Sequence, residues 1–257
     1  MECLQTPSVG VGSADSIHLK MNLRDQIRET GYAIVRGGDF LIPLSLQQSW
    51  RDFTASWNDL SEDAYLRDAG FRRLRRYSHF LYNPLAGEMS PLPSADYYQS
   101  ESVNPLFGGI MRRFEPLRPP TQRNSFLNQL IVLDLKQLPV SDAQLWSPWK
   151  IGIHQIRIAC KGNRPALPAP EGVHRDGHSF VVMHLIAKQN VFGGTSNIYQ
   201  EERTLVRSFT LNAAMDSIFI DDSRVLHDVT HVEPTKRDHA ANRDVLVLTY
   251  DCAKGFE

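Results

Sequence analysis

In the second half of the sequence, polar and apolar residues alternate with a period of two, and this alternation constrains the fold more than any other feature. From residue 151 onward it predicts short strands, with turn signals such as Gly193-Gly194 and Asp221-Asp222 between several of them. Short strands at fairly even spacing, with no helix between them, predict an antiparallel barrel or a double-sheet jelly roll. The expected strands cover residues 151–158, 172–185, 195–200, 205–211, 217–220, 225–230 and 244–250.

The first half of the sequence predicts helices and loops around that barrel. Apolar residues three and four apart predict helices at about 45–60 and 124–136, and a short helix before Gly31 leads into a strand at 32–35. Seven prolines between residues 84 and 120 argue against long regular elements there and favour binding loops over a separate domain.

This order of elements predicts one domain preceded by an arm. We expect a flexible N-terminal arm over residues 1–19 and a single domain over 20–257. Within that domain, residues 20–140 are expected to form helical and loop support with a lid over the substrate, and residues 145–252 the β core.

Composition excludes several classes of partner and compartment. Lys and Arg total 28 against 29 for Asp and Glu, a net charge of −1, so overall charge favours neither nucleic acid nor an acidic membrane. The three cysteines are far apart, which argues against a disulfide framework and fits a reducing compartment. The sequence has no secretory signal and no apolar run near the ~18 residues that span a bilayer. We expect a cytoplasmic monomer or homodimer that binds neither nucleic acid nor membrane.

His174-Arg175-Asp176 and the later His227 have the residue types of a metal site. Two imidazoles and one carboxylate match the facial triad that holds non-haem Fe(II) and leaves coordination positions open. Residues i and i+2 of a strand share a face, so an extended segment directs His174 and Asp176 at one metal. A zinc hydrolase can use similar ligands, and a lone histidine in a strand is usually a hydrogen-bonded core residue.

Arginines in the predicted strands are candidate partners for a bound carboxylate. Arg243 begins the last strand and offers a planar fork to a carboxylate inside the barrel, which zinc chemistry does not require. With the triad, it favours an iron oxygenase that consumes a keto acid. Arg157 and its face neighbour Gln155 are further candidates, because an arginine inside a barrel is costly unless it pairs with a charge. An exposed edge-strand position is the alternative for Arg157.

His178 has the same strand parity as His174 and Asp176. In a continuous strand it contacts substrate, donates to a metal ligand or packs in the core, and these three possibilities stay open. Gly177 is a position where the strand can bend.

Several short motifs occur in order between about residue 70 and residue 249. They are Arg76-Tyr77-Ser78, Tyr97-Tyr98-Gln99-Ser100, Ile151-Gly152-Ile153-His154-Gln155-Ile156-Arg157, Arg164-Pro165, Val173-His174-Arg175-Asp176, His184-Leu185, Gly193-Gly194 and Asn242-Arg243-Asp244. In type and order they resemble the Fe(II)/2-oxoglutarate dioxygenases that act on free amino acids, in particular the bacterial L-isoleucine 4-hydroxylase group.

The resemblance implies a mainly β protein with N-terminal helices and a double-stranded β-helix core, which is a cupin-like jelly roll. It implies Fe(II) bound by His174, Asp176 and His227, and 2-oxoglutarate held at its distal carboxylate by Arg243. O2 is then the oxidant, and ascorbate is expected to help the reaction in vitro.

The resemblance also implies a small aliphatic amino acid as substrate, such as isoleucine, leucine, valine or methionine. Its side chain is expected to be hydroxylated, desaturated or cyclised, with succinate and CO2 as co-products. Arg76, beside Tyr77 in the resembling block, is the predicted partner of the substrate carboxylate, although four arginines within residues 72–76 usually form a solvated face. Tyr77 and Tyr98 are further candidate substrate contacts, and Tyr98 and Gln99 are candidates for the lid, with ordinary loop packing as the alternative.

Two rival functions remain at this point. A peptide or protein hydroxylase on the same fold needs an open groove and usually a charged docking surface, which the charge balance does not support. A non-catalytic cupin-like protein that binds a metal or ligand leaves Arg243 unexplained.

Overall fold

The computed structural model describes residues 15–66, 72–93, 96–101, 103–104, 106, 108–160, 164–236 and 239–253 of the 257-residue protein. Residues 1–14 of the predicted arm lie outside these ranges. The last residues of that arm include β1 (His18–Leu19), which pairs with β3 (Phe40–Leu41).

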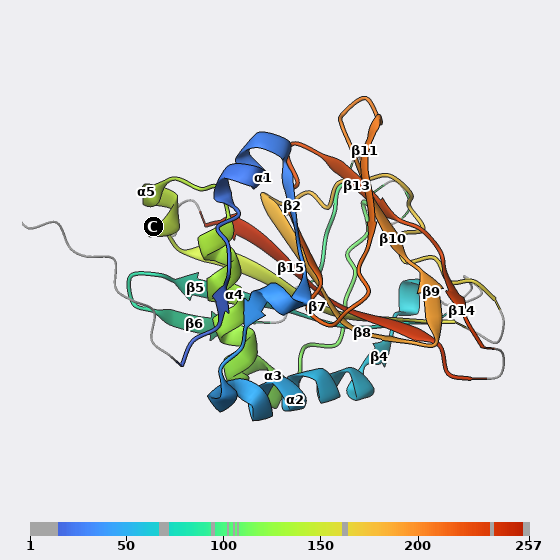
Figure 1. The fold of residues 1–257 in the computed structure, drawn as a ribbon, viewed down its shortest axis with the longest axis horizontal. Coiled ribbons are helices and arrows are strands. Elements are labelled where there is room, and N and C mark those ends of the chain that lie inside the picture. Colours follow the sequence, from blue (N-terminus) through green and yellow to red (C-terminus); the bar gives the residue numbers. More distant parts are fainter. Residues whose placement is uncertain are drawn as a thin grey trace, which may run out of the picture.

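A large antiparallel sheet runs through the middle of the molecule (Figure 1). β15 lies at its centre, because it pairs with β7 on one side and with β8 on the other. A hairpin partner, β6 (Glu88–Pro91), is added to β5. In spatial order the strands are β2 (Tyr32–Val35), β12 (Ser217–Asp221), β8 (Phe180–Gln189), β15 (Asn242–Cys252), β7 (Trp149–Ala159), β5 (Arg72–Asn83) and β4 (Ser61–Glu62).

A smaller antiparallel sheet lies on the side of the large sheet that faces away from the helices (Figure 1). It consists of β11 (Leu205–Thr210), β10 (Thr195–Tyr199) and β13 (Leu226–Val229), in that order. A two-stranded ribbon of β9 (Val191–Gly193) and β14 (Val232–Pro234) lies beside it. The protein is therefore mainly β, with two sheets facing each other.

Helices cover the other face of the large sheet (Figure 1). They are α1 (Arg24–Thr30), α2 (Gln47–Ala55), α3 (Pro119–Gln122), α4 (Ser125–Gln137) and α5 (Asp142–Leu145), with 3-10 turns at Gly37–Asp39, Leu44–Leu46, Ser56–Asp59 and Ala64–Leu66. α4 begins after Asn124, whose side chain accepts a hydrogen bond from the Leu127 N–H and so satisfies a free donor of the first turn. None of the helices among the described residues is both long and apolar enough to cross a membrane.

The central strands bury both of their faces. On β15, Leu246, Leu248 and Tyr250 belong to the core shared with the helices. The alternate residues Val245 and Val247 pack in the clusters between the two sheets. Burying each of these aliphatic side chains contributes about 1.5–3 kcal/mol, so the strand is held from both sides.

The structure confirms the predicted helices and corrects two predictions about strands. The strand expected over residues 172–185 begins only at Phe180, because Gly177 adopts a φ of +84° and residues before it form a loop. β5, a strand of 12 residues, was not predicted. Its polar residues point to both faces, so it lacks the alternation by which strands are recognised.

Candidate active site

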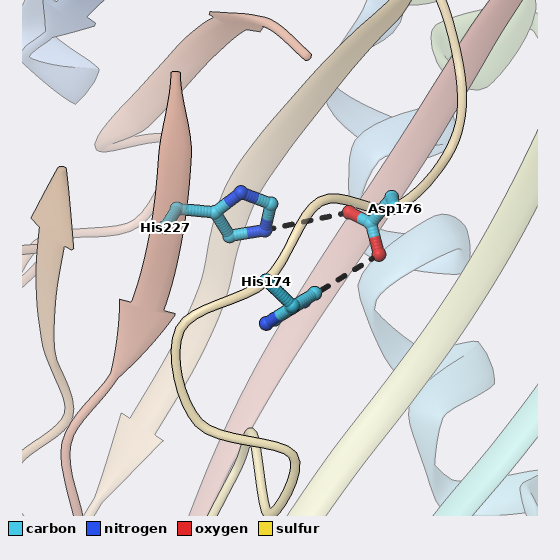
Figure 2. A group of neighbouring side chains, drawn as sticks. All are labelled: His174, Asp176 and His227. Atoms are coloured by element: carbon cyan, nitrogen blue, oxygen red, sulfur yellow. Dashed lines mark ion pairs between the residues drawn. The ribbon is translucent and has the colours of Figure 1, made fainter. Parts of the chain in front are cut away.

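His174, Asp176 and His227 bring one ligand atom each close together (Figure 2). The three ligand atoms lie within 4.8 Å of one another. Nε2 of His227 is 3.4 Å from Oδ2 of Asp176, and Nε2 of His174 is 3.7 Å from Oδ1 of the same carboxylate. Two imidazole nitrogens and a carboxylate oxygen suit Fe(II), and three protein ligands leave coordination positions open.

The two histidines are aligned through their backbones. His227 lies on β13, and His174 pairs with it in an isolated antiparallel bridge. The Nδ1 atom of His174 is 2.8 Å from the carbonyl oxygen of Gly172. A hydrogen bond donated by Nδ1 leaves the lone pair on Nε2, the nitrogen nearest Asp176, as metal binding requires.

Asp222 holds the loop that carries the aspartate ligand. Its buried carboxylate accepts hydrogen bonds from the backbone N–H groups of Asp176, Gly177 and His178, at 3.0, 2.7 and 3.1 Å. Burial, together with the nearby charge of Asp176, raises the pKa of Asp222. The sequence marked Asp222 only as a turn residue, and its role depends on a contact across the fold that no local pattern encodes.

The charges of the ligands favour a cation. Burial opposes protonation of His174, but the carboxylates of Asp176 and Glu171 and the carbonyl of Gly172 outweigh it and raise its pKa to about 9. The pKa of Asp176 is held well below its usual value, since the two histidines offset its burial. A metal cation would meet an ionised carboxylate here, and its binding would compete with a proton on His174.

A cavity of about 110 Å³ adjoins the three ligands, and we call it the central cavity. Strand register determines which residues face it. His154 on β7 lies opposite Val247 on β15, and Ile156 lies opposite Arg75 on β5. Apolar walls come from Ile156, Met183 and Val247, with Val229 of β13 across from them.

Charged side chains of both signs line the central cavity. Arg73, Arg75 and Arg112 are the cations, and Glu171 joins Asp176 as an anion. Arg73 is neutralised by Asp63 at 2.7 Å. Arg112 donates to the side-chain oxygen of Gln99 at 2.5 Å, and the Gln99 amide donates to the backbone carbonyl of Asp176 at 2.9 Å.

Arg243 lies on the cavity face of β15 but behind the cavity wall. It is 1% exposed, and its Nη2 is 3.6 Å from the sulfur of Met183, which lines the cavity. Among the described residues its Nε has no hydrogen-bond partner, and no ion pair involves it. Burial lowers its pKa to about 10. A buried guanidinium without a counter-charge is costly, so this position suits a ligand carboxylate.

On β5 and β7, the residues predicted to contact ligands lie on the face opposite to the one that lines the central cavity. Arg76 pairs in register with Gln155, and Arg157 with Asp244, on the face turned away from the central cavity. Arg157 binds both carboxylate oxygens of Asp244 at 2.7 Å. Arg76 donates to the carbonyls at positions 59 and 116, and Gln155 to the Ser56 hydroxyl. The structure therefore places these three predicted ligand contacts elsewhere.

The other predicted substrate contacts are also displaced from the central cavity. Tyr77 stacks on His154 at a ring-centroid distance of 4.2 Å, and His154 lines the cavity. Tyr98 is 55% exposed, whereas the neighbouring Tyr97 is buried and lines the cavity. His178 binds Asp251 at 2.7 Å, because the turn at Gly177 breaks the strand parity on which its prediction rested.

Comparison with known proteins places this geometry in a family. The family described as 2OG-Fe dioxygenase matches residues 54–249, which is most of the chain and includes all three ligands. The chain belongs to the 2OG-Fe dioxygenase family. It is therefore an Fe(II)/2-oxoglutarate-dependent dioxygenase, and its reaction uses Fe(II), 2-oxoglutarate and O2.

Individual relatives extend along most of this dioxygenase. It is 27% identical over 237 residues to the 3(1)-hydroxy-L-isoleucine 4-dioxygenase of Pantoea ananatis, covering 90% of this chain and 95% of the relative. It is 26% identical over 194 residues to the L-isoleucine-4-hydroxylase of Bacillus thuringiensis, covering 75% and 78%. Among solved structures, a bsmA homolog from Methylobium petroleophilum superposes with a TM-score of 0.77 at 28% identity, covering 91% and 95%.

Proposed function

We propose that this dioxygenase oxidises an unactivated C–H bond in the side chain of a small free L-amino acid of the isoleucine, leucine, valine or methionine type. Hydroxylation, desaturation and ring closure are all compatible with that chemistry. The observation that carries the proposal is the central cavity, which places opposite charges and an apolar wall beside the three metal ligands. One relative is named as acting on L-isoleucine and the other on a hydroxy-L-isoleucine, and these names support the same substrate class.

Each part of the metal and cosubstrate site has a proposed role. His174, Asp176 and His227 hold Fe(II), and Arg243 binds the distal carboxylate of 2-oxoglutarate with its planar fork. When bound, Fe(II) and 2-oxoglutarate supply the oxidising power from O2, and succinate and CO2 are the co-products. Gly194 supports the role of Arg243 because it leaves room for the guanidinium. A Cβ at position 194 would lie 3.3 Å from Nε of Arg243 and 2.8 Å from Cγ1 of Val232.

The remaining residues of the site position the substrate rather than react with it. Met183, Val229 and Val247 offer an apolar surface to an aliphatic side chain and exclude water from it. Which hydrogen reacts depends on its distance from the metal, since a displacement of about 1 Å can cost about 100-fold in rate. Asp222 keeps Asp176 in place through three backbone hydrogen bonds.

We also propose that the two facing sheets form the double-stranded β-helix expected from the sequence, with residues 145–252 as its core and residues 20–140 as its support. The antiparallel order of the large sheet and the small sheet that covers its inner face support this assignment. The small sheet carries the proposed metal ligand His227 on β13, and the large sheet carries the proposed cosubstrate arginine, Arg243, on β15.

The test is the amino-acid dependence of succinate formation. Purified protein receives Fe(II), 2-oxoglutarate, ascorbate and O2 with each of the twenty amino acids, and products are analysed by mass. We expect succinate and oxidised amino acid in equal amounts for one aliphatic amino acid, and neither with His174→Ala or Arg243→Ala. Succinate without loss of any amino acid contradicts the substrate class and leaves the enzyme class intact. A product heavier by one oxygen indicates hydroxylation, and one lighter by two hydrogens indicates desaturation or ring closure.

A further inference from the structure

We propose that Glu171 and Arg75 form the two ends of a site for a zwitterion in the central cavity. Glu171 binds the α-ammonium group of the substrate, and Arg75 binds its α-carboxylate. This inference rests on the proposed function and deepens it, because it explains how a free amino acid is distinguished from other small aliphatic molecules.

Glu171 is a half-buried carboxylate whose one ion-pair partner among the described residues is His174, a proposed metal ligand. Its side chain is 13% exposed and lines the central cavity, and its Oε2 atom has no hydrogen-bond partner among the described residues. Its Oε1 atom lies 3.6 Å from Nε2 of His174. That nitrogen is the one that faces the metal, and Glu171 itself lies outside the set of three ligands. The contact with His174 leaves Oε2 without a donor, and the ammonium group of a ligand can supply one.

Arg75 is the corresponding buried cation. It is 7% exposed, and no ion pair among the described residues includes it. Its Nη2 donates to Nδ1 of His154 at 2.6 Å, while Nε has no partner in the described part of the protein. The guanidinium lies 4.1 Å from the ring centroid of Phe114 and 5.2 Å from that of Tyr97. These contacts fix its position without neutralising its charge.

The other charged residues of the cavity are less suited to these roles. Asp176 is a metal ligand, and Arg73 is already neutralised by Asp63. Arg112 is engaged by Gln99, which in turn supports the loop of Asp176. Glu171 and Arg75 are thus the anion and the cation of the cavity that the charged groups of a ligand can pair with.

The cosubstrate and substrate carboxylates then have separate partners. Arg75 on β5 lies opposite Ile156, whereas Arg243 on β15 lies opposite Ile158. β7 runs between the two arginines, so they are separated by two strand spacings, about 10 Å across the sheet. A dicarboxylate held at Arg243 leaves Arg75 available for the amino acid.

The test measures binding instead of turnover, in protein loaded with Mn(II) and 2-oxoglutarate without O2. Calorimetric titrations compare L-isoleucine, L-leucine, L-valine and L-methionine with the 2-hydroxy acids of the same side chains, which keep the carboxylate and lack the ammonium group. The amino-acid amides keep the ammonium group and lack the carboxylate. Wild type is expected to bind at least one amino acid more tightly than both of its analogues.

Glu171→Gln is expected to weaken binding of that amino acid by about 30-fold or more, the effect of removing one partner of a buried charge pair, and to change hydroxy-acid binding little. Glu171→Asp restores part of the preference for the amino acid. Arg75→Gln weakens binding of amino acid and hydroxy acid alike but changes binding of the amide little. Glu202→Gln and Arg207→Gln, at exposed positions, are the matched controls and bind as wild type does.

The outcomes separate the two levels of the proposal. If wild type binds none of the amino acids, the proposed substrate class fails and the zwitterion site fails with it. If wild type binds one of them and Glu171→Gln weakens amino acid and hydroxy acid equally, or weakens neither, the ammonium site is wrong while the substrate class stands. Retained affinity for Mn(II) in Glu171→Gln establishes that the variant is folded and that its metal site is intact.

Discussion

His174 and His227 are hydrogen-bonded to each other through their backbones. The N–H of His174 donates to the carbonyl of His227 at 3.0 Å, and the N–H of His227 donates to the carbonyl of His174 at 2.9 Å. The loop before β8 is thereby fixed against β13, and the two imidazoles approach one point from segments 53 positions apart in the numbering. Asp176 has no such strand pairing within the described part of the protein, and its backbone is held by Asp222 and Gln99.

Asp222→Asn is therefore expected to weaken metal binding by about 10–100-fold, as loss of a group that orients a ligand usually does. The amide retains an acceptor but loses the charge that holds three backbone N–H groups. Titration of metal-free protein with Mn(II) measures the effect. Asp221→Asn is the matched control, since the Asp221 carboxylate binds the nearby Ser223. Equal affinities for the two variants would argue against the positioning role.

Gly177→Ala is expected to disturb the same loop through sterics. A Cβ at this position would lie 3.0 Å from Val103, and a φ of +84° costs a non-glycine residue about 1–2 kcal/mol. We expect a lower unfolding temperature together with weaker Mn(II) binding. Gly87→Ala is the control, because its φ of +66° carries backbone strain while nothing lies within 4 Å of the added Cβ. That variant is expected to lose stability and retain metal affinity.

Arg243→Met is expected to raise the Kd of 2-oxoglutarate by about 30-fold or more, since it removes the buried charge proposed to meet the distal carboxylate. Arg157→Met serves as its counterpart on the neighbouring strand. Its loss removes the ion pair with Asp244 and leaves that carboxylate with the Asn242 amide as donor, so it is expected to lower the free energy of unfolding and leave the Kd within about 3-fold of wild type. Calorimetry on the Mn(II)-loaded proteins measures the Kd of 2-oxoglutarate in both variants. A raised Kd in Arg157→Met with an unchanged Kd in Arg243→Met would instead assign the distal carboxylate to Arg157.

The buried His154 and the half-buried His79 oppose stability in mild acid. Burial, with the nearby charge of Lys150, lowers the pKa of His79 to about 4, and burial beside Arg75 holds the pKa of His154 well below its usual value. Between the unfolded value of about 6.5 and pH 4, the unfolded protein therefore binds protons that the folded protein does not. The contribution of these two histidines to the free energy of unfolding is expected to fall as pH drops through this window, whereas His174, with its raised pKa, contributes in the opposite direction.

Urea unfolding of metal-free protein at pH 7 and pH 5 measures that change. On going from pH 7 to pH 5, the free energy of unfolding of His79→Gln is expected to rise relative to that of wild type, because His79 no longer titrates in the variant. An equal change in the two proteins would show that protonation of His79 does not oppose folding.

The sequence singled out by residue type the three residues whose possible ligand atoms meet in the structure, but by an incomplete structural argument. An aspartate and two histidines are identifiable because few other combinations suit an open iron site. The argument placed His174 and Asp176 on one continuous strand. In the structure His174 forms a single bridge and Asp176 lies in a loop.

The charged residues of the cavity were harder to predict, because β5 carries arginines on both of its faces. A choice between Arg75 and Arg76 is a choice of face, and a shift of one residue exchanges the faces. Only the register against β7, which sets Arg75 opposite Ile156 and Arg76 opposite Gln155, decides it. Glu171 was not predicted for a related reason: its proposed role depends on its place in the central cavity beside His174, which no local sequence pattern shows.

The position of β7 between β5 and β15 also has a consequence for how such enzymes diversify. The arginine proposed to meet the amino acid lies on one neighbour of β7, and the arginine proposed to bind the keto acid lies on the other. Substitutions on non-contacting strands usually combine additively. A lineage can thus alter on β5 how the substrate carboxylate is held while it inherits the proposed keto-acid arginine on β15 unaltered.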